Sequence, residues 1–529
     1  MTGSALLDTN GLVPILTLSL ALLVPCHVFF VSKRERVAGI PHVPSLLPFI
    51  GYGPAYFSSI SQNSVKLRQK FGDIYTMLIF GRLYCKVHKS EDVETLLRLP
   101  EKKASMLEAY LDLAGPSLPQ PDKSKQLQAS AKMKRLLDPR LHSGTPLIAH
   151  SVRPRNLQSW VPDIQQTLQQ RFDTLLQDSG TVSLFDWCQD LISAVTVRMM
   201  LGAKVANSPD LLQRFVDLFN ESDPEQGFSG PLQGLATMAE VTVRGERKIY
   251  GKVREILFPL IDEEMELVVN HKQRQNDDNG SDEDASALSS MVSSWYHRKL
   301  NGNGEELALA RTRIANDLFS FTFAAFSNSF GMSAWVLFHY LRDTNGLQSV
   351  LREELLDKNN QATHTYPHLE ATILEIGRLY TPGDLHRKLR EDWTLPSNPN
   401  VTLPKGTVLL VSALTTMREE SRFPNPQDID IARDYKTAGN MFIPFGTGAH
   451  PCVGKKLALL EIALITARVI QQLDLELIPG DKDGTCEFTN QVLSGVRDHP
   501  PCDLGQPGFI WRPAVPIMIK YHKKGTKHA

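Results

Sequence analysis

The stretch IPFGTGAHPCVG, residues 443–454, places one cysteine, Cys452, among three glycines, a histidine and two prolines. Glycines at positions 446, 448 and 454 let the backbone turn tightly and approach a partner without a collision at Cβ. The apolar pattern that follows predicts a helix over residues 455–473. The Cys452 sulfur can therefore face unpaired N–H groups and the positive end of that helix dipole, and both favour a thiolate.

A thiolate on a loop, backed by N–H donors and offered to a planar partner, suits the iron of a heme as an axial ligand. The alternative is a buried structural cysteine, which is the usual state of a lone cysteine. The chain has six cysteines, and none of them forms a C-x-x-C pair. This spacing argues against a disulfide scaffold or a zinc ribbon and favours a reducing compartment.

The overall composition is that of a globular protein. The chain has 529 residues, of which 42% are hydrophobic and 22% are charged. This is enough for two or three domains, or for one large and mainly helical domain. The formal net charge of -1 offers no basic surface for nucleic acid, so we expect no nucleic-acid partner.

The amino-terminal region predicts a membrane anchor. Residues 11–31 carry no formal charge and are long enough to cross about 30 Å of hydrocarbon. The basic stretch SKRER, residues 32–36, follows directly, so we expect a luminal tail over residues 1–10 and a cytosolic body. A cleaved signal peptide is the alternative, but its basic start and small-residue exit are both missing.

Beyond the anchor we expect a mainly α-helical body with a smaller β portion. Clustered prolines indicate a stiff, non-helical hinge over residues 32–55, followed by one globular domain over residues 56–529. Residues 272–288 are acidic and poor in apolar side chains, which predicts a solvated loop. Hydrophobic spacing predicts the other elements: a hairpin over 72–88, helices over 161–200, 307–341 and 369–380, and short strands over 385–414.

Phe445, Gly448, Cys452 and Gly454 follow the spacing F-x-x-G-x-x-x-C-x-G. This loop resembles the heme-binding loop of the cytochrome P-450 family at each fixed position. The resemblance implies the cytochrome P-450 fold and heme b as the cofactor. It also implies that Cys452 is the axial iron ligand, that Phe445 shields the sulfur, and that His450 bonds a heme propionate.

Further motifs of that family precede the loop in the same order. Glu375 and Arg378 in EIGR resemble its E-x-x-R helix, and Arg433 stands where the family has a second arginine. Because an unpaired buried charge would be very costly, we expect these three residues to pair and to be structural. Arg387 in HRKLRED resembles an arginine that reaches a heme propionate.

The resemblance covers roughly residues 30–510 and is closest to the microsomal branch, with its anchor, prolines and hairpin. It is weakest over residues 123–160, where the family has a W-x-x-x-R helix that contacts heme. Here the stretch AKMKRLLDPR has no tryptophan at that spacing. Lys132, Lys134 or Arg135 would have to make the contact instead.

The centre of the long predicted helix departs from the family pattern. Most members carry an acid followed by an alcohol, and the pair delivers protons by general acid chemistry. This chain has AAFSNS, with Ser327 in the acid position, Asn328 in the alcohol position and Ser329 beside it. The asparagine at this position makes the chain similar to the subgroup of prostacyclin synthase and the sterol 7α- and 12α-hydroxylases. Members of that subgroup either oxygenate or isomerise their substrates. Asn328 could also be only a satisfied polar residue inside a helix.

The resemblance implies a heme-thiolate monooxygenase anchored in the endoplasmic reticulum membrane. NADPH-cytochrome reductase, with cytochrome b5 as a second donor, would dock near Cys452, where Lys455 and Lys456 could meet an acidic flavoprotein. Phenylalanines at 319, 321, 323, 326 and 330 favour an apolar substrate, such as a sterol, terpenoid or other natural product of secondary metabolism. Two alternatives remain: an isomerase or dehydratase that needs neither O2 nor NADPH, and a non-catalytic heme-binding sensor.

Overall fold

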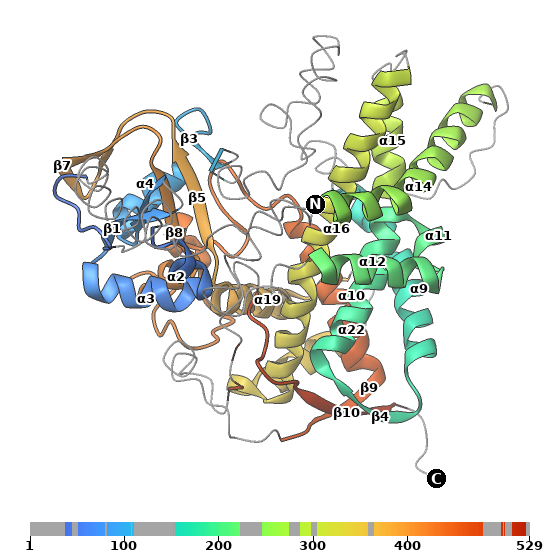
Figure 1. Ribbon diagram of the computed structural model, residues 1–529. Coiled ribbons are helices and arrows are strands. Elements are labelled where there is room, and N and C mark those ends of the chain that lie inside the picture. The colour runs from blue at the N-terminus through green and yellow to red at the C-terminus, as the bar shows by residue number, and fades with distance from the viewer. Residues whose placement is uncertain are drawn as a thin grey trace, which may run out of the picture.

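The computed structural model shows a sheet-containing part and a helical part on either side of one long helix, α16 (Figure 1). It describes residues 37–44, 51–79, 82–106, 108–109, 152, 154–222, 246–274, 286–297, 304–357, 364–479, 499–500, 502 and 510–524. The largest hydrophobic core lies in the helical part, and two smaller cores lie in the sheet-containing part.

The helical part is built around α10 (Leu184–Leu201) and α16 (Gly304–Leu341). α10 is apolar on nearly all sides and is buried accordingly, as expected for a helix in the interior of a large domain. α16 packs against α10, α14, α19 and α22, so its side chains meet most of the helical core. The surrounding helices are α9 (Pro154–Leu175), α11 (Ala203–Ala206), α12 (Pro209–Ser222), α14 (Glu246–Arg274), α15 (Ala287–His297), α17 (Leu347–Leu356), α19 (Pro367–Tyr380) and α22 (Lys455–Gln472).

The sheet-containing part holds a five-stranded sheet in the order β1-β2-β8-β5-β3. β2 and β8 run parallel, and the other neighbours are antiparallel. The central strand β8 reads VLLVS and is buried throughout, because both of its faces are covered. The elements of this part are β1 (Ile74–Ile79), β2 (Arg82–Val87), β3 (Ala104–Ser105), β5 (Asp384–Leu389), β8 (Val408–Ser412), α2 (Gly53–Ser58), α3 (Ile60–Phe71) and α4 (Ser90–Arg98).

Two smaller sheets and several short helices complete the described fold. The order β4-β10-β9 brings the end of the chain back against the helical part, while β6 and β7 form a separate hairpin. Their bounds are β4 (Ser179–Ser183), β9 (Leu473–Leu477), β10 (Met518–Lys523), β6 (Trp393–Leu395) and β7 (Asn398–Leu403). The short helices are η4 (Thr344–Gly346), α20 (Ala413–Thr416), α21 (Tyr435–Ala438) and η5 (Gly439–Met441).

Part of the proline-rich segment that is expected to be a stiff, non-helical hinge lies along β1. Three backbone hydrogen bonds of 2.7–2.9 Å join them: Val43 N–H to Thr76 O, Thr76 N–H to Pro41 O, and Tyr52 N–H to Leu78 O. Residues 53–55 are helical, because Pro54 stands in the first turn of α2, where its missing N–H is not needed. Backbone hydrogen bonds therefore tie this segment to the edge of the sheet at residues 41, 43 and 52, and its last residues begin α2.

The expected mainly helical fold with a smaller β portion is confirmed. The hairpin over 72–88 is β1 and β2, and the central helix over 307–341 is α16, which begins three residues earlier. The helices over 161–200 are α9 and α10, but strand β4 separates them. Of the predicted acidic loop over residues 272–288, residues 272–274 belong to α14 and residues 287–288 to α15, and residues 275–285 lie outside the described residues.

The predicted anchor over residues 11–31 and the tail before it lie outside the described residues. Within the part of the chain that the structure describes, no helix combines the length and the apolarity needed to cross a bilayer. The anchor stays a prediction.

Candidate active site

The loop before α22 is held by its own backbone. The N–H of Cys452 donates to the carbonyl of Phe445 at 2.6 Å, and the N–H of Gly446 donates to that of Ile443 at 3.0 Å. Gly446 has a φ of 65°, and a Cβ atom there would come within 2.7 Å of the carbonyl oxygen of His450. These turns set Cys452 directly before the first turn of α22.

Gly448 fits the loop onto a neighbouring helix. Its φ is 66°, and a Cβ atom there would collide with the carbonyl oxygen of Leu97 in α4. At Gly454 the φ is negative, and a Cβ atom would lie 4.0 Å from the Cys452 sulfur. The sequence suggested that these glycines make room for a flat partner, but the structure shows that Gly448 makes room for α4.

No side chain caps the first turn of helix α22. The Cys452 sulfur lies beside the N–H groups that a cap would otherwise bind. The backbone N–H groups of Gly454 and Lys455 lie near the sulfur and favour its thiolate form. These N–H groups and the Lys455 charge lower the pKa of the thiol, but desolvation of the sulfur by the surrounding loop raises it by more, so the pKa lies above its ordinary value although the residue as a whole is exposed. The effect of the N–H groups inferred from the sequence is therefore present and is outweighed. Binding of a metal cation would complete the ionisation.

Cys452 differs from the other cysteines that the structure describes. Cys85, Cys188 and Cys502 are buried, whereas Cys452 is exposed. Burial also raises the pKa of the Cys85 and Cys188 thiols, which makes them inert structural residues. Among the described cysteines, Cys452 is thus the one whose sulfur a ligand can reach.

Two basic side chains converge on one carboxylate beside this loop. His450 Nε2 lies 2.8 Å from a carboxylate oxygen of Glu101, and the same carboxylate interacts with Arg387 of β5. Arg387 is 1% exposed, and its Nε has no hydrogen-bond partner among the described residues. Burial lowers the pKa of Arg387 to about 10, so it stays charged at neutral pH. This donor set suits a carboxylate such as a heme propionate.

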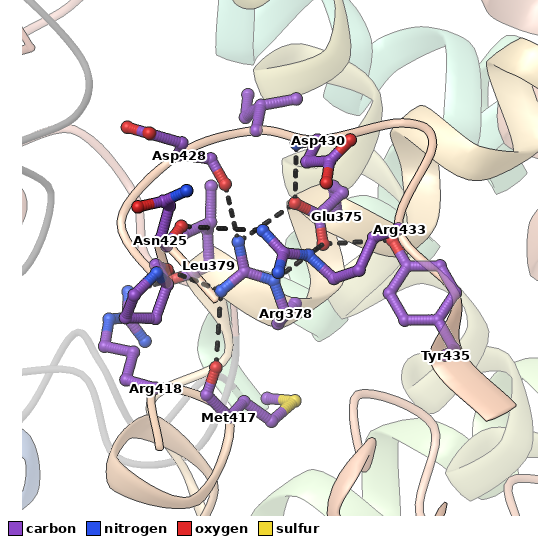
Figure 2. Close-up of polar contacts among 12 residues, drawn as sticks. Glu375, Arg378, Leu379, Met417, Arg418, Asn425, Asp428, Asp430, Arg433 and Tyr435 are labelled. Carbon is purple, nitrogen blue, oxygen red and sulfur yellow. Dashed lines mark hydrogen bonds and ion pairs between the residues drawn. The ribbon is translucent and has the colours of Figure 1, made fainter. Parts of the chain in front are cut away.

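Glu375, Arg378 and Arg433 form a buried ion-pair cluster on and beside α19 (Figure 2). Arg378 donates to both oxygens of Glu375, from Nε at 2.6 Å and from Nη2 at 2.9 Å. Arg433 Nε donates to Glu375 at 3.2 Å, and the Tyr435 hydroxyl donates to it at 3.0 Å. The structure thus brings the three predicted residues together, and every charge in the cluster is paired.

Arg378 also holds the irregular segment that follows α20. Its N–H groups donate to three carbonyls: Met417 at 3.3 Å, Pro426 at 2.6 Å and Asp428 at 2.7 Å. The N–H of Asp430 donates to Glu375 at 2.8 Å. Sequence reasoning missed these contacts, because backbone carbonyls are the same in every residue and leave no mark in the sequence.

Ser327, Asn328 and Ser329 lie in the middle of α16 but meet different neighbours. Asn328 Oδ1 accepts a hydrogen bond from the N–H of Ile510 at 3.2 Å. Ser329 lies beside the carboxyl group of Glu461 on α22. The Ser327 hydroxyl is buried and has no hydrogen-bond partner among the described residues. The three side chains are therefore not gathered at one point.

The contact at Asn328 comes from a segment that sequence reasoning did not connect with the site. Ile510 also packs closely on α16, because a Cβ atom at Gly331 would lie 3.2 Å from its side chain. Farther along, the guanidinium of Arg512 lies 4.7 Å from the centre of the Phe330 ring. This C-terminal segment therefore runs along α16 and fixes the amide of Asn328.

The phenylalanines of α16 divide into core residues and partly exposed ones. Phe319, Phe326 and Phe330 are buried, and Phe321 and Phe323 are partly exposed. Phe326 stacks on Phe219 of α12, with ring centres 5.0 Å apart. Ser320 and Ala324 are exposed although α16 is an interior helix, and with Asn328 they share one face. Small residues leave this face of α16 open.

These features fit a heme held by Cys452. An exposed sulfur, two basic groups that converge on a carboxylate, and an open face of small residues supply an axial ligand, propionate partners and space. The residues weighed for the remaining heme contact, Lys132, Lys134 and Arg135, lie outside the described part of the chain.

Comparison with known proteins shows relatives of nearly the same length. The lanosterol 14-alpha demethylase of Eremothecium gossypii is 22% identical over 521 residues, which cover 92% of this chain and 90% of that protein. The sterol 14-alpha demethylase of Aspergillus flavus is 23% identical over 521 residues, which cover 92% and 93%. A cytochrome P-450 monooxygenase of Aspergillus terreus is 30% identical over 182 residues, which cover 31% of this chain and 46% of that protein.

A solved structure and a family model agree with these relatives. A cyanobacterial cytochrome P-450 with retinoic acid bound superposes with a TM-score of 0.63 at 18% identity, covering 92% of this chain and all of that chain. This likeness shows the cytochrome P-450 fold. The model of the cytochrome P-450 family matches residues 41–501. The chain therefore belongs to the cytochrome P-450 family of heme-thiolate oxidoreductases.

Proposed function

We propose that the protein inserts one oxygen atom from O2 into an apolar substrate, with electrons delivered from NADPH through a reductase. The observation that carries this proposal is the exposed sulfur of Cys452 at the uncapped start of α22. Two backbone N–H groups lie near it, and it stands in a loop that matches the family spacing. The alternative for a lone cysteine is a buried structural residue, and the exposure of Cys452 does not fit it.

The residues around the loop would divide the work of holding the cofactor. Heme, once bound, supplies the activation of O2. Cys452 would bind its iron, while the N–H groups of Gly454 and Lys455 moderate the charge on the sulfur. Arg387 and His450 would bind the propionates and so set the orientation of the ring. Phe445 would shield the sulfur, and Gly448 and Gly454 shape the loop around it.

Asn328 has a restricted role on α16. Its Oδ1 accepts the Ile510 N–H, so the amide offers its own N–H groups to other partners. Those groups can orient a water molecule or a substrate oxygen, but an amide is a poor proton donor at neutral pH. Since residues 324–329 include no carboxylate, the proton must come from another residue.

The substrate class follows from the character of α16 and from the relatives. Phe321 and Phe323 are the partly exposed rings of this helix, and they could line an apolar pocket. Relatives of nearly full length are named as sterol demethylases. We therefore propose a sterol, a terpenoid or a similar natural-product skeleton, in secondary metabolism.

The partners and the location belong to the same proposal. The segment of residues 11–31 would anchor the protein once in the endoplasmic reticulum membrane, with the globular domain in the cytosol. NADPH-cytochrome reductase, and cytochrome b5 as a second donor, would dock on the face near Cys452. Lys455 and Lys456 would supply positive charge for an acidic flavoprotein there.

The test is expression in microsomes and incubation with a lipophilic extract of the native organism, with and without NADPH and reductase. Mass spectrometry should find a product heavier by one oxygen atom, and only when NADPH is present. Cys452→Ser should abolish both the product and the red-shifted Soret band of the reduced carbon monoxide complex. A surviving band in that variant would show that another residue binds the iron.

The absence of a carboxylate at residues 324–329 favours a second candidate, a heme-thiolate isomerase or dehydratase. Such an enzyme does not activate O2, so it needs no proton donor for that step. The same incubation separates the two candidates, because an isomerase would form a product of unchanged mass without NADPH or reductase.

A further inference from the structure

Tyr380, the last residue of α19, lies in a buried chain of hydrogen bonds. Its hydroxyl group is 2.7 Å from His339 Nε2 of α16 and 2.6 Å from His499 Nε2 of the C-terminal region. The other ring nitrogen of His339 lies 3.0 Å from the Thr344 hydroxyl. The other ring nitrogen of His499 lies 2.6 Å from the Pro500 carbonyl. All three rings are buried, so water does not compete for these bonds.

The carbonyl at the end fixes the direction of every bond in this chain. A carbonyl oxygen only accepts, so His499 Nδ1 carries a hydrogen and donates to Pro500. Burial lowers the pKa of His499 to about 4 and that of His339 well below its ordinary value, so both rings are neutral at pH 7. The Nε2 atom of neutral His499 is therefore an acceptor, and the Tyr380 hydroxyl donates to it. His339 Nε2 then donates to the Tyr380 oxygen, while its Nδ1 accepts from the Thr344 hydroxyl.

Tyr380 also holds the backbone of the C-terminal region. Its carbonyl lies at the end of α19, where no later turn of the helix supplies a donor, and it accepts the N–H of Trp511 at 3.0 Å. The indole N–H of Trp335 in α16 donates to the Trp511 carbonyl at 2.6 Å. The Trp335 ring stacks on Tyr380, with ring centres 4.2 Å apart, and on His499 at 4.9 Å. One tyrosine therefore fixes two points of the C-terminal region, His499 and Trp511.

Trp511 directly follows the residue that bonds Asn328. The N–H of Ile510 donates to Asn328 Oδ1 at 3.2 Å, and the Ile510 side chain packs on Gly331, about one turn along α16. An amide carries its oxygen and its NH2 group on different sides, so this bond decides where the two donor hydrogens of Asn328 point. Movement of Trp511 would move the adjacent N–H of Ile510 and release the amide.

We propose that Tyr380 is a positioning residue of the α16 site and sets the orientation of the Asn328 amide. It does so by holding His499 and Trp511, which keep Ile510 against α16. Tyr380 is 0% exposed, so it acts only through these neighbours. The amide can then place a water molecule or a substrate oxygen in one fixed direction. The effect on turnover rests on the proposed oxygenation, whereas the effect on the C-terminal backbone does not.

The first test measures amide hydrogen exchange in the heme-loaded full chain at pH 7 and needs no turnover. Tyr380→Phe keeps the stacked ring but removes the hydroxyl, so both histidines lose a partner in the interior. Exchange at residues 510–512 should become faster by about 10-fold or more, while exchange in α10 should change less than about 2-fold. Unchanged exchange at residues 510–512 would overturn the proposal.

Tyr75→Phe is the matched control, because it removes a buried hydroxyl that has no hydrogen-bond partner among the described residues. It should change exchange at residues 510–512 less than about 2-fold. An effect as large as that of Tyr380→Phe would mean that any hydroxyl lost from the core loosens this region, and would contradict the proposal.

Two variants of His499 keep the proposal testable if Tyr380→Phe does not fold. His499→Ala removes the acceptor of the Tyr380 hydroxyl and should give the same local increase in exchange. His499→Gln supplies an amide oxygen close to the position of Nε2 and should restore part of the protection. If the alanine variant shows no increase, or the glutamine variant exchanges as fast as the alanine variant, the bond to Tyr380 does not hold this region and the proposal is wrong.

The second test is a double-variant cycle on the share of NADPH consumption that ends in product. Tyr380→Phe should lower this share about 3-fold or more in the wild-type chain, but less than about 1.5-fold in a chain that already carries Asn328→Ala. The amide through which Tyr380 acts is missing from that second chain. An equal factor in both chains would mean that Tyr380 supports the fold without orienting Asn328, and would overturn the inference. A wild-type chain that makes no oxygenated product contradicts the proposed function, and hydrogen exchange then decides alone whether Tyr380 holds the C-terminal region.

Discussion

Gly448 sits where neither its backbone nor its neighbour admits a side chain. Its φ is 66°, and a Cβ atom would strike the carbonyl of Leu97 in α4. Gly448→Ala should therefore lower the free energy of unfolding by about 3 kcal/mol or more, through strain and a backbone collision together. Urea unfolding measures this loss, and heme content after purification should fall with it, because the strained loop also carries Cys452.

Gly251→Ala is the control for Gly448→Ala, because it makes the same substitution at a glycine with free space around it. Gly251 lies inside α14, and a Cβ atom there would meet nothing within 4 Å. Alanine should stabilise this helix by up to about 1 kcal/mol, since glycine is the poorer helix former. If both substitutions have the same effect, the loop does not depend on close contact with α4.

At the scale of secondary-structure elements, Arg378 joins α19 to the segment over residues 417–430. Arg378→Lys keeps the charge but removes the planar fork that reaches Glu375 and three carbonyls. The loss of at least two charge-assisted hydrogen bonds, at about 1.5–3 kcal/mol each, should lower the free energy of unfolding by at least about 3 kcal/mol. Thermal or urea unfolding of the heme-loaded protein gives the value.

Lys103→Ala is the control for Arg378→Lys, because it breaks an ion pair on the surface instead of a buried one. The pair of Lys103 with Glu391 is exposed, with about half of each side chain open to solvent. Solvent screens such pairs, so the expected change is at most about 1 kcal/mol. A loss as small as this in Arg378→Lys would mean that the cluster around Glu375 does not hold α19 in place.

At the scale of the whole molecule, membrane attachment and folding should be separable. A chain that starts at Val37 lacks the predicted anchor over residues 11–31 but keeps the segment bonded to β1. It should leave the membrane fraction after a carbonate wash and unfold at the same urea concentration as the full chain. A chain that starts at Gly53 also loses the three bonds to β1, and its unfolding midpoint should fall. Release of the full-length chain by the same wash would show that residues 11–31 do not anchor it.

Local patterns predicted the helices well and the small strands poorly. α16, α19 and α22 were placed within a few residues, because apolar spacing and helix-ending prolines act over neighbouring positions. Strand β4 was missed, since SGTVS is short and polar and becomes a strand only by pairing with β10. For the same reason the prolines of residues 32–55 predict only a stiff hinge, whereas Pro41 and Val43 are bonded to β1.

The sequence by itself determined the family and the loop that presents Cys452, because both depend on residue types at fixed spacings along the chain. It also singled out Glu375, Arg378 and Arg433, because they resemble family motifs that follow one another in a fixed order. Only the tertiary structure decided that Asn328 is bonded to Ile510 and that Tyr380 lies between His339 and His499. Burial, pairing and the protonation of a histidine ring depend on residues that are far apart in the chain, and only folding brings these together.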